Sequence, residues 1–396
     1  MDFEIKAETR ERLARIDEFV EQELFPLEER FLSQPFAELL PAVEEKRRQV
    51  KELGLWAPGH PREHGGLGLG LVELGLISEA LGRSPLGHFT FGCHAPDAGN
   101  IEILHQYGSE AQKEQYLDDL IAGRKRSCFS MTEPDMPGSN PVLLETSAVR
   151  DGDEWVINGR KWYTTAADGA DLAVVMAVTD PDQPRHRRAS MILVPADTPG
   201  FVHLRRLPVM GEEGDGYFSH SEILYENCRV PVDNLLGPQG QAFVIAQERL
   251  GPGRIHHCMR WLGICRRAFD LLCSRATQRT IADGQTLADR ELIQAWIAEL
   301  YGEIRAARLI TLHTAWQIER EGWRAAREDI SMIKFQVAGT LQKVLDRALQ
   351  VHGGLGMVDD TPIAWFFRHE RAARIYDGPD EVHKLSLARR ILRGWR

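Results

Sequence analysis

One carboxylate near the C-terminus, Asp377, has surroundings that suit acid–base chemistry. It lies between the pair Ile375-Tyr376 and the break Gly378-Pro379, a pattern typical of a loop that holds a side chain against a pocket wall. An ordinary Asp has a pKa of about 3.9, so it removes a proton from carbon only where burial raises its basicity and a neighbouring carbonyl is polarised. We regard Asp377 as a candidate catalytic base, with a solvated loop carboxylate as the alternative.

Two polar stretches could hold a flat, phosphorylated ligand. In residues 129–140, the hydroxyls of Thr132 and Ser139 and the amides around Gly138 can hydrogen-bond a polar ring and a phosphate. In the second stretch, strand alternation would put the Trp162 indole and the Thr164 hydroxyl on one side, where a heterocycle can stack on one and bond the other. Taken singly, the first stretch is weakly specific, and Trp162 could equally be a core residue.

Three further positions could bind an anionic ligand, either through a positive charge or through a backbone that the ligand can approach closely. The segment Gly251-Pro252-Gly253-Arg254 is predicted to head a helix and to present a fixed cation to an anionic ligand; a structural salt bridge is equally common. Arg279 follows the same predicted helix, and Gln350 to Gly356 forms a corner where the backbone can approach a phosphate. Each of these positions is ambiguous by itself.

The amino-acid composition and net charge argue against some classes of function. The 396 residues are 43% hydrophobic and 27% charged, as in ordinary globular proteins, and the formal net charge of -10 argues against nucleic acid or an anionic membrane as the main partner. We expect a protein without a signal peptide or membrane span, located in the cytoplasm. The six cysteines lack zinc-like spacing, and the adjacent pair His256-His257 cannot clamp one metal, so no metal site is expected.

The chain predicts three domains: a helical one over 1–127, a β domain over 128–237 and a helical bundle over 238–396. Apolar residues recur every three or four positions in the first and last parts, which favours packed amphipathic helices. The Gly-rich run 65–70 has no preceding strand and is predicted to be a tight turn before a helix over 72–81. The fold class is therefore α+β.

The middle part is predicted to be a meander of strands. Asp151-Gly152 and Asn158-Gly159 both favour the positive φ angles of tight hairpins, so strands are expected on either side of each dipeptide. In the N-terminal helical part, residues 94–97 could line an acyl tail, and Asp97 could meet a hydroxyl or phosphate of a substrate. Capping of the helix that runs through Ile101 and Leu104 is the favoured role of Asp97.

Together these motifs resemble the acyl-CoA dehydrogenase family over almost the whole chain. The matching segments fall in the family's order and at about its spacing: Gly65-Gly66-Leu67-Gly68, Met131-Thr132-Glu133-Pro134 with Gly138-Ser139, Trp162 with Thr164, Arg229-Val230-Pro231, Arg279, Gln350 to Gly354, and Tyr376-Asp377-Gly378. The resemblance implies the family's fold, with an N-terminal helical domain, a central β-barrel-like domain and a C-terminal four-helix bundle.

The resemblance also implies a cofactor, a reaction and partners. FAD would lie between the β domain and the bundle, contacted by Phe129, Met131, Thr132, Gly138, Ser139, Trp162, Thr164 and Glu381, and by Arg279, Gln350 and Gly354 from a neighbouring subunit. Asp377 would take the α-proton of an acyl-CoA as the β-hydride passes to flavin N5, giving a trans-2-enoyl-CoA. Ser139, Arg254, Tyr376 and Gly378 would bind the substrate. A homodimer or homotetramer and an electron-transferring flavoprotein are the implied partners.

Several positions depart from the usual family pattern. Most members carry Glu where Asp377 stands, Pro379 replaces a Thr, Glu381 stands where Gln is common, and the loop after Arg279 differs. With Gly251 to His257, these features resemble a subgroup whose animal members are fused to a kinase-like domain and handle hydroxylated acyl-CoAs. Two other functions remain open at this stage: a nitroalkane-oxidase-like flavin enzyme that uses Asp377 as its base, and a flavin-binding scaffold without turnover.

Overall fold

The computed structural model describes residues 4–395, apart from the side chains of residues 250–252, and divides the chain into two compact units. The first consists of Met1–Gln34, Leu69–Thr90 and Gly251–Arg396, and the second of Pro35–Gly68 and Phe91–Leu250. The second unit contains one large sheet, whereas helices dominate the first. Together they give a mixed α+β fold, as the sequence predicts.

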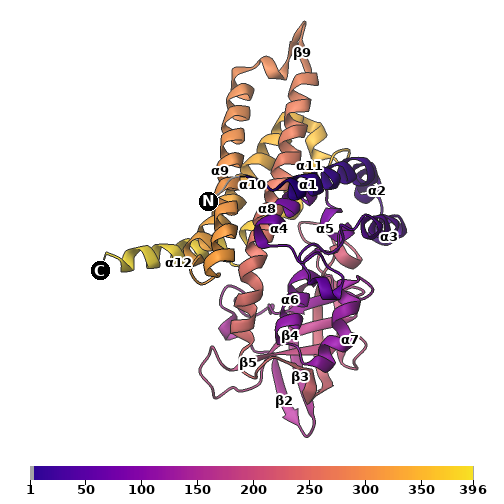
Figure 1. Ribbon diagram of the computed structural model, residues 1–396, viewed down its shortest axis with the longest axis vertical. Coiled ribbons are helices and arrows are strands. Elements are labelled where there is room, and N and C mark those ends of the chain that lie inside the picture. The colour runs from indigo at the N-terminus through magenta and orange to yellow at the C-terminus, as the bar shows by residue number, and fades with distance from the viewer. Residues whose placement is uncertain (1–3, 396) are drawn as a thin grey trace. The chain divides into compact units, whose positions relative to one another are not determined.

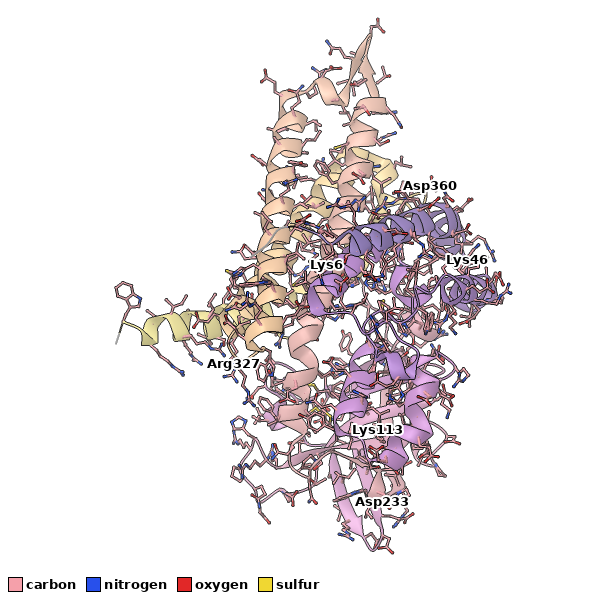
Figure 2. The ribbon with its side chains drawn as sticks, in the orientation of Figure 1. Lys6, Lys46, Lys113, Asp233, Arg327 and Asp360 are labelled. Carbon is pink, nitrogen blue, oxygen red and sulfur yellow. The ribbon has the colours of Figure 1, made fainter. Side chains whose placement is uncertain are left out.

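Long helices build the first unit, because its apolar residues recur with helical spacing. Its main helices are α1 (Ala7–Phe19), α2 (Glu28–Ser33), α4 (Leu71–Leu81), α5 (Gly87–Thr90), most of α8 (Ala242–Gln278), α9 (Glu291–Glu321), α10 (Arg327–His352), α11 (Pro362–Glu370) and α12 (Asp380–Arg393). The predicted stripe of α10 is buried, from Ile330 to Val351, and Gly353 ends the helix with a φ of 60°. In Figure 1, α9 and α10 run alongside each other, and Figure 2 labels Arg327 at the first turn of α10.

Two details of this unit differ from the sequence expectation. The segment Gly251-Pro252-Gly253 lies inside α8 and does not head a helix, so Arg254 projects from the middle of a 37-residue helix. Glycine and proline disfavour helices locally, but tertiary packing along so long a helix overrides those preferences. The altered loop after Arg279 is a hairpin of β9 (Thr280–Ala282) and β10 (Gln285–Thr286), which Figure 1 shows at the far end of α8 and α9.

The second unit is organised around an eight-stranded sheet with the order β6-β7-β3-β2-β4-β5-β8, and β1 pairs with β4. The strands are β1 (Ser127–Ser130), β2 (Ser147–Asp151), β3 (Glu154–Thr165), β4 (Leu172–Val178), β5 (Ala189–Pro195), β6 (Phe201–Arg206), β7 (His220–Pro231) and β8 (Leu235–Leu236). Helices α3 (Phe36–Glu52), α6 (Asp97–Tyr107) and α7 (Glu110–Ile121) complete the unit. Alternate strand residues, among them Trp155 and Tyr225, form its buried core.

The helix preceding the sheet begins as predicted, but one predicted hairpin is wrong. Ser109 caps α7 and forms a capping box with Gln112, as the spacing of these two residues indicates. Asn158-Gly159, by contrast, does not turn the chain: it lies within β3, which pairs with β7 on both sides of a bulge there. The Asn158 side chain accepts a hydrogen bond from the Asn227 amide, so the dipeptide marks a bulge and not a hairpin.

The Gly-rich segment forms a tight turn, as predicted, and glycine is required there by crowding. A Cβ on Gly66 would lie 2.1 Å from the His60 carbonyl oxygen, so no larger residue fits without a shift of the backbone. The His60 side chain is itself buried, and burial lowers its pKa to about 4. The imidazole is therefore neutral in the folded protein near pH 7.

His60 should make stability depend on pH. Its folded pKa of about 4 lies below the ordinary 6.5, so unfolding takes up a proton between these values; the stabilisation is present above pH 6.5 and lost as the pH falls toward 4. Between pH 7 and pH 5, the free energy of unfolding of the wild type should fall by about 2 kcal/mol more than that of His60→Gln. Urea unfolding at both pH values measures this difference, with the exposed His313→Gln as a control for the effect of a His-to-Gln substitution as such. The prediction would be contradicted if the free energies of unfolding of the wild type and of His60→Gln changed equally between the two pH values.

Candidate active site

The loop around Asp377 is held by its backbone in the first unit. The Asp377 carbonyl accepts hydrogen bonds from the Arg254 guanidinium, at 3.3 Å from both Nε and Nη2, and from His383 Nε2 at 3.0 Å. Lys334 Nζ donates to the carbonyls of Ala373 at 2.6 Å and Gly378 at 3.1 Å. Asp377 adopts a left-handed φ of 54°, which this dense set of contacts keeps in place.

The protonation of His383 follows from its partner and its surroundings. A carbonyl oxygen only accepts, so Nε2 of His383 carries the hydrogen. Burial lowers the pKa of His383 to about 4, so the ring is neutral at pH 7. A Cβ on Gly378 would lie 2.7 Å from this same Nε2, so the glycine lets His383 reach the loop. Burial also lowers the pKa of Lys334, and nearby Asp377 opposes that shift.

Beside the loop, Tyr376 is anchored through its hydroxyl. The hydroxyl oxygen accepts from Arg260 Nη2 at 2.9 Å and from Trp261 Nε1 at 3.0 Å, and the Arg260 guanidinium also pairs with the buried Glu370. Burial raises the pKa of Tyr376, so the hydroxyl stays protonated. The substrate contact expected of Tyr376 stays a prediction; its hydroxyl is engaged inside the unit, which leaves the ring for such a contact.

The Asp377 carboxylate faces His257, which belongs to one of the sequence motifs but was given no role by them. His257 Nε2 lies 3.4 Å from Asp377 Oδ2, and the two side chains are 17% and 19% exposed. The His257 ring stacks on Trp261, with an interplanar angle of 24°, and lies 5.3 Å from the Tyr376 ring. The position of Trp261 beside His257 follows from helical spacing, and the position of Tyr376 beside Asp377 follows from their adjacency in the chain. No local sequence signal, however, indicates that α8 approaches this later loop.

In the second unit, the segment after β1 is locked to β3. Thr132 Oγ1 donates to the Trp162 carbonyl at 2.8 Å, and the Trp162 amide donates to the Thr132 carbonyl at 3.1 Å. Trp162 is half-buried, and Phe129 is half-buried with the Arg249 guanidinium 4.2 Å from its ring centroid. Gly138 and Ser139 are exposed, so their amides and hydroxyl are open to a ligand. The structure thus brings Thr132 and Trp162 together, and their contact with a flavin stays a prediction.

The strand alternation from which Trp162 and Thr164 were placed on one side does not hold here. The register shifts between Lys161 and Thr164, and Tyr163 has a φ of 49°, so simple alternation fails along this part of β3. Thr164 is fully buried, and its hydroxyl lies 3.2 Å from the hydroxyl of Ser130. A bulge cannot be read from residue types alone, which is why the expectation failed.

A buried ion pair, which the sequence motifs also do not reveal, supports this segment. Lys161 is fully buried and donates from Nζ to Met131 O at 2.8 Å and to Glu133 Oε1 at 2.9 Å. Glu133 also accepts from the amides of Glu145 and Thr146 at 2.7 and 2.9 Å. Burial lowers the pKa of Lys161 to about 8, while Glu133 opposes that shift. The pair fixes the turn that carries Met131 and Thr132.

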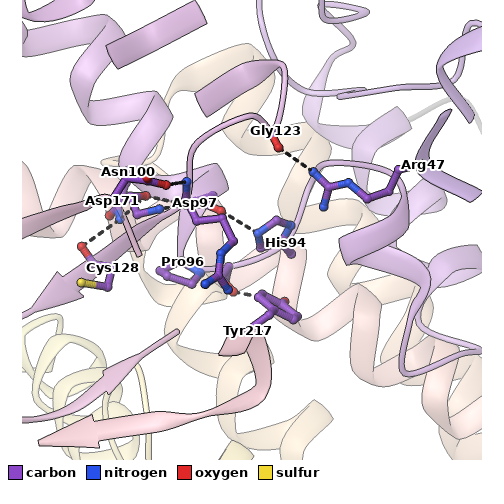
Figure 3. A network of polar contacts seen from close by, with 12 residues as sticks. Arg47, His94, Pro96, Asp97, Asn100, Gly123, Cys128, Asp171 and Tyr217 are labelled. Atoms are coloured by element: carbon purple, nitrogen blue, oxygen red, sulfur yellow. Dashed lines mark hydrogen bonds and ion pairs between the residues drawn. The ribbon is translucent and has the colours of Figure 1, made fainter. Parts of the chain in front are cut away.

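Asp97 does not cap its helix, contrary to the favoured expectation. The N-cap of α6 is Pro96 without a side-chain hydrogen bond, and Asp97 is the first helical residue. Its Oδ1 accepts from the Ser127 amide at 2.6 Å and from the Ser127 hydroxyl at 2.5 Å, and its Oδ2 contacts His94 Nε2 at 2.6 Å (Figure 3). Burial pushes the pKa of Asp97 upward, but His94 and Ser127 outweigh it and hold the pKa below its ordinary value. The carboxylate is therefore engaged inside the unit.

The remaining predicted cofactor residues lie at the surface of the first unit. Arg279 follows α8, Gln350 and Gly354 lie at the end of α10, and Glu381 lies in the first turn of α12; all four are exposed. Among residues 4–395, no three His, Cys, Asp or Glu side chains gather as metal ligands. None of the described helices is long and apolar enough to cross a membrane.

A groove of about 860 Å³ opens within the second unit. Its wall includes residues 143–150, the loop after β4 up to Arg188, and Gln239. Arg150, Arg185 and Arg188 line it together with the carboxylates of Glu145 and Asp180. Arg188 is fixed by donation to the Val142 carbonyl at 2.6 Å, whereas Arg185 is exposed. The groove is therefore a place where cations gather on a protein of negative net charge.

Comparison with known proteins decides the family. Residues 6–124, 128–228 and 240–392 match the N-terminal, middle and C-terminal domains of acyl-CoA dehydrogenases. The chain belongs to the acyl-CoA dehydrogenase family. It is 42% identical to the probable acyl-CoA dehydrogenase FadE2 of Mycobacterium tuberculosis, over 98% of this chain and 96% of that protein. This membership makes the chain an oxidoreductase of a family whose members bind FAD.

Other relatives agree with this assignment. Acyl-CoA dehydrogenase family member 11 of Gallus gallus is 39% identical over 96% of this chain, which spans half the length of that relative. A solved Mycobacterium abscessus protein assigned to the acyl-CoA dehydrogenases has a TM-score of 0.95 and 38% identity, with both chains fully covered. The expected acyl-CoA dehydrogenase fold, with helical, β and helical domains along the chain, is confirmed.

Proposed function

We propose that this protein is an FAD-dependent acyl-CoA dehydrogenase in which Asp377 removes the α-proton of the substrate. The observation that carries the proposal is the construction of the Asp377 loop. Arg254, Lys334 and His383 fix its backbone through hydrogen bonds, yet the carboxylate itself remains 19% exposed. A carboxylate on a rigid support, partly open to a ligand, has the properties of a general base.

The polar groups of the second unit fit a flavin nucleotide. Thr132 and Trp162 are bonded to each other, and Gly138-Ser139 offers exposed donors for a phosphate. When bound, FAD would supply the acceptor for the substrate's β-hydride. Phe129 and Met131 lie on the same segment as Thr132, and Thr164 supports it from within the core.

We propose the subunit arrangement and the electron acceptor that the family resemblance implies. The exposure of Arg279, Gln350 and Gly354 supports their contact with the FAD of a neighbouring subunit, in a homodimer or homotetramer. Glu381 would reach FAD from the start of α12. An electron-transferring flavoprotein would reoxidise the flavin. The family domains would then correspond to residues 1–127, 128–237 and 238–396.

We expect substrate contacts from Ser139, Arg254, Tyr376 and Gly378. The Gly378 amide would hydrogen-bond the thioester carbonyl, because Arg254 and His383 fix the orientation of its peptide group through the Asp377 carbonyl. Ser139 would bind the phosphates, Tyr376 would line the acyl pocket, and Arg254 would contribute its positive charge beside the loop. We propose that the acyl chain of the substrate is hydroxylated, because Asp377 in place of the more usual Glu is a feature shared with the subgroup that handles hydroxylated acyl-CoAs.

We propose that the arginine-lined groove receives the nucleotide end of CoA. Arg150 and Arg185 would then contribute to substrate affinity and not to chemistry. The double variant Arg150→Ala/Arg185→Ala should raise KM for acyl-CoA about tenfold and leave kcat unchanged, because each exposed phosphate contact contributes about 1 kcal/mol or less. Steady-state kinetics at low and moderate salt measure this change. The exposed Arg229→Ala is the matched control, and an equal rise of KM in the control would contradict the assignment.

Anaerobic titration of the FAD-loaded protein tests the proposed function. Straight-chain and 4-hydroxylated acyl-CoAs are added while flavin absorbance is followed, and bleaching with a thioester is the expected result. Bleaching by a nitroalkane alone, with oxygen uptake, would replace the proposal by a nitroalkane-oxidase-like reaction. Absence of bleaching with every compound would favour a flavin-binding scaffold.

A further inference from the structure

Asp377 is held differently at its backbone and at its side chain. The backbone carbonyl has Arg254 and His383 as partners, and the next carbonyl, of Gly378, has Lys334. Within the described residues, the side chain at ion-pair distance from the carboxylate is that of His257, 3.4 Å from Oδ2. The orientation of the two carboxylate oxygens is thus governed by a different group from those that hold the loop.

The His257 ring has little freedom to turn away. It stacks on Trp261, one helical turn further along α8, and the rings of Tyr376 and His256 also contact it. Trp261 is fully buried and donates to the Tyr376 hydroxyl at 3.0 Å, so the two aromatic neighbours are fixed to each other. An imidazole held between them keeps Nε2 close to the same carboxylate oxygen.

We infer that His257 is a positioning residue for Asp377: its Nε2–H holds Oδ2 and leaves Oδ1 to take the α-proton. An ionised carboxylate only accepts hydrogen bonds, so Nε2 must be the donor. The separation of 3.4 Å is slightly longer than an ordinary hydrogen bond, and catalytic hydrogen bonds commonly shorten when substrate binds. This inference rests on the proposed function.

The assignment of the oxygens specifies the proton-transfer step. The α-carbon–hydrogen bond breaks and an oxygen–hydrogen bond forms at Oδ1, while the released electron pair becomes the α,β double bond as the β-hydride leaves to the bound flavin. His257 keeps its own proton throughout. Asp is one methylene shorter than the Glu of most family members, so its reach depends more on a fixed orientation.

Two variants separate the effect of the hydrogen-bond donor of His257 from the effect of its ring. His257→Phe keeps an aromatic ring beside Trp261 and Tyr376 but has no donor, whereas His257→Gln places an amide nitrogen near the position of Nε2. The rate of anaerobic flavin bleaching at saturating acyl-CoA should fall about 10- to 100-fold in the Phe variant and no more than a few-fold in the Gln variant, since a hydrogen bond to a charged group is lost only in the former. The dissociation constant of acyl-CoA should be unchanged in both variants.

A second readout does not depend on flavin reduction. Exchange of the α-proton of a thioester into D₂O, followed by mass spectrometry, should slow in His257→Phe and persist in His257→Gln. Equal rates in wild type and the Phe variant would overturn the inference, and so would equal impairment of both variants, which would indicate a packing role. Thermal unfolding of each variant shows whether packing is disturbed.

Measurement of Asp377→Asn in the same experiments separates this inference from the proposed function. If Asp377→Asn bleaches and exchanges like the wild type, Asp377 is not the base and the proposed function fails. If Asp377→Asn is inactive while His257→Phe is fully active, only the role of His257 fails. The expected result is a strong loss in Asp377→Asn and a smaller one in His257→Phe.

Discussion

Replacement of Asp377 by Asn is expected to slow flavin reduction by acyl-CoA about 10²- to 10⁴-fold, the range attributed to a positioned general base. Asn has nearly the same shape as Asp but cannot accept the proton. The loop backbone should be unaffected, because Arg254 and His383 bind the carbonyl of residue 377 and not its side chain. Anaerobic stopped-flow absorbance measures the rate.

Asp377→Glu is the matched control for this prediction. It restores a carboxylate but moves it outward by one methylene, so activity should exceed that of the Asn variant. Acyl-CoA should bind all three proteins with similar affinity, because Asp377 acts on the transition state and not on substrate binding. An Asn variant that reduces flavin within a few-fold of the wild-type rate would show that another group is the base.

Lys161→Met should produce the largest loss of stability in the second unit. The substitution removes the ammonium that pairs with buried Glu133, and breaking a buried ion pair from one side costs about 3–5 kcal/mol. Met131 loses its hydrogen bond from the same group, so the turn that carries Met131 and Thr132 should loosen and purified protein should retain less flavin. Urea unfolding and the flavin-to-protein absorbance ratio measure the two effects.

The double variant Lys161→Met/Glu133→Gln distinguishes lost pairing from lost packing. Removal of the second charge should recover part of the free energy of unfolding, because a neutral amide in place of the Glu133 carboxylate leaves no unpaired buried anion. If the double variant is as unstable as Lys161→Met alone, the loss comes from packing of the lysine stem and not from the ion pair.

Much of the fold follows from local sequence signals. The stripe from Ile330 to Val351 with glycine beyond it predicts α10, and Ser109 with Gln112 predicts the start of α7. These succeed because hydrophobic periodicity and capping act over a few residues. The family resemblance adds the order of the domains, which local signals alone could not specify.

The errors arise where tertiary contacts decide. Asn158-Gly159 suits a hairpin, but pairing of β3 with β7 across it produces a bulge. Asp97 suits an N-cap, but the neighbouring Ser127 and His94 bind its carboxylate instead. The hairpin after Arg279, in contrast, had a readable signal, since Asp283-Gly284 is a dipeptide typical of two-residue turns and Gly284 has a φ of 68°.

The sequence indicated the candidate reactive group of the site, but not the residues that hold it in place. Asp377 could be selected from its own loop, whereas His257 and Lys334 approach that loop from distant helices. Lys334 offered a weak signal, because it sits next to Ile333 in a stripe that is otherwise apolar and buried. A lysine in such a position must bond buried carbonyls or carboxylates, as it does here.

The most direct test of the central claim uses acyl-CoA deuterated at the α-carbon. Wild-type protein should bleach more slowly with this substrate than with the protiated one, and its enoyl-CoA product should retain one of the two deuterons. Asp377→Asn should form almost no product from either substrate. Rapid product formation by Asp377→Asn would contradict the assignment of Asp377 as the base.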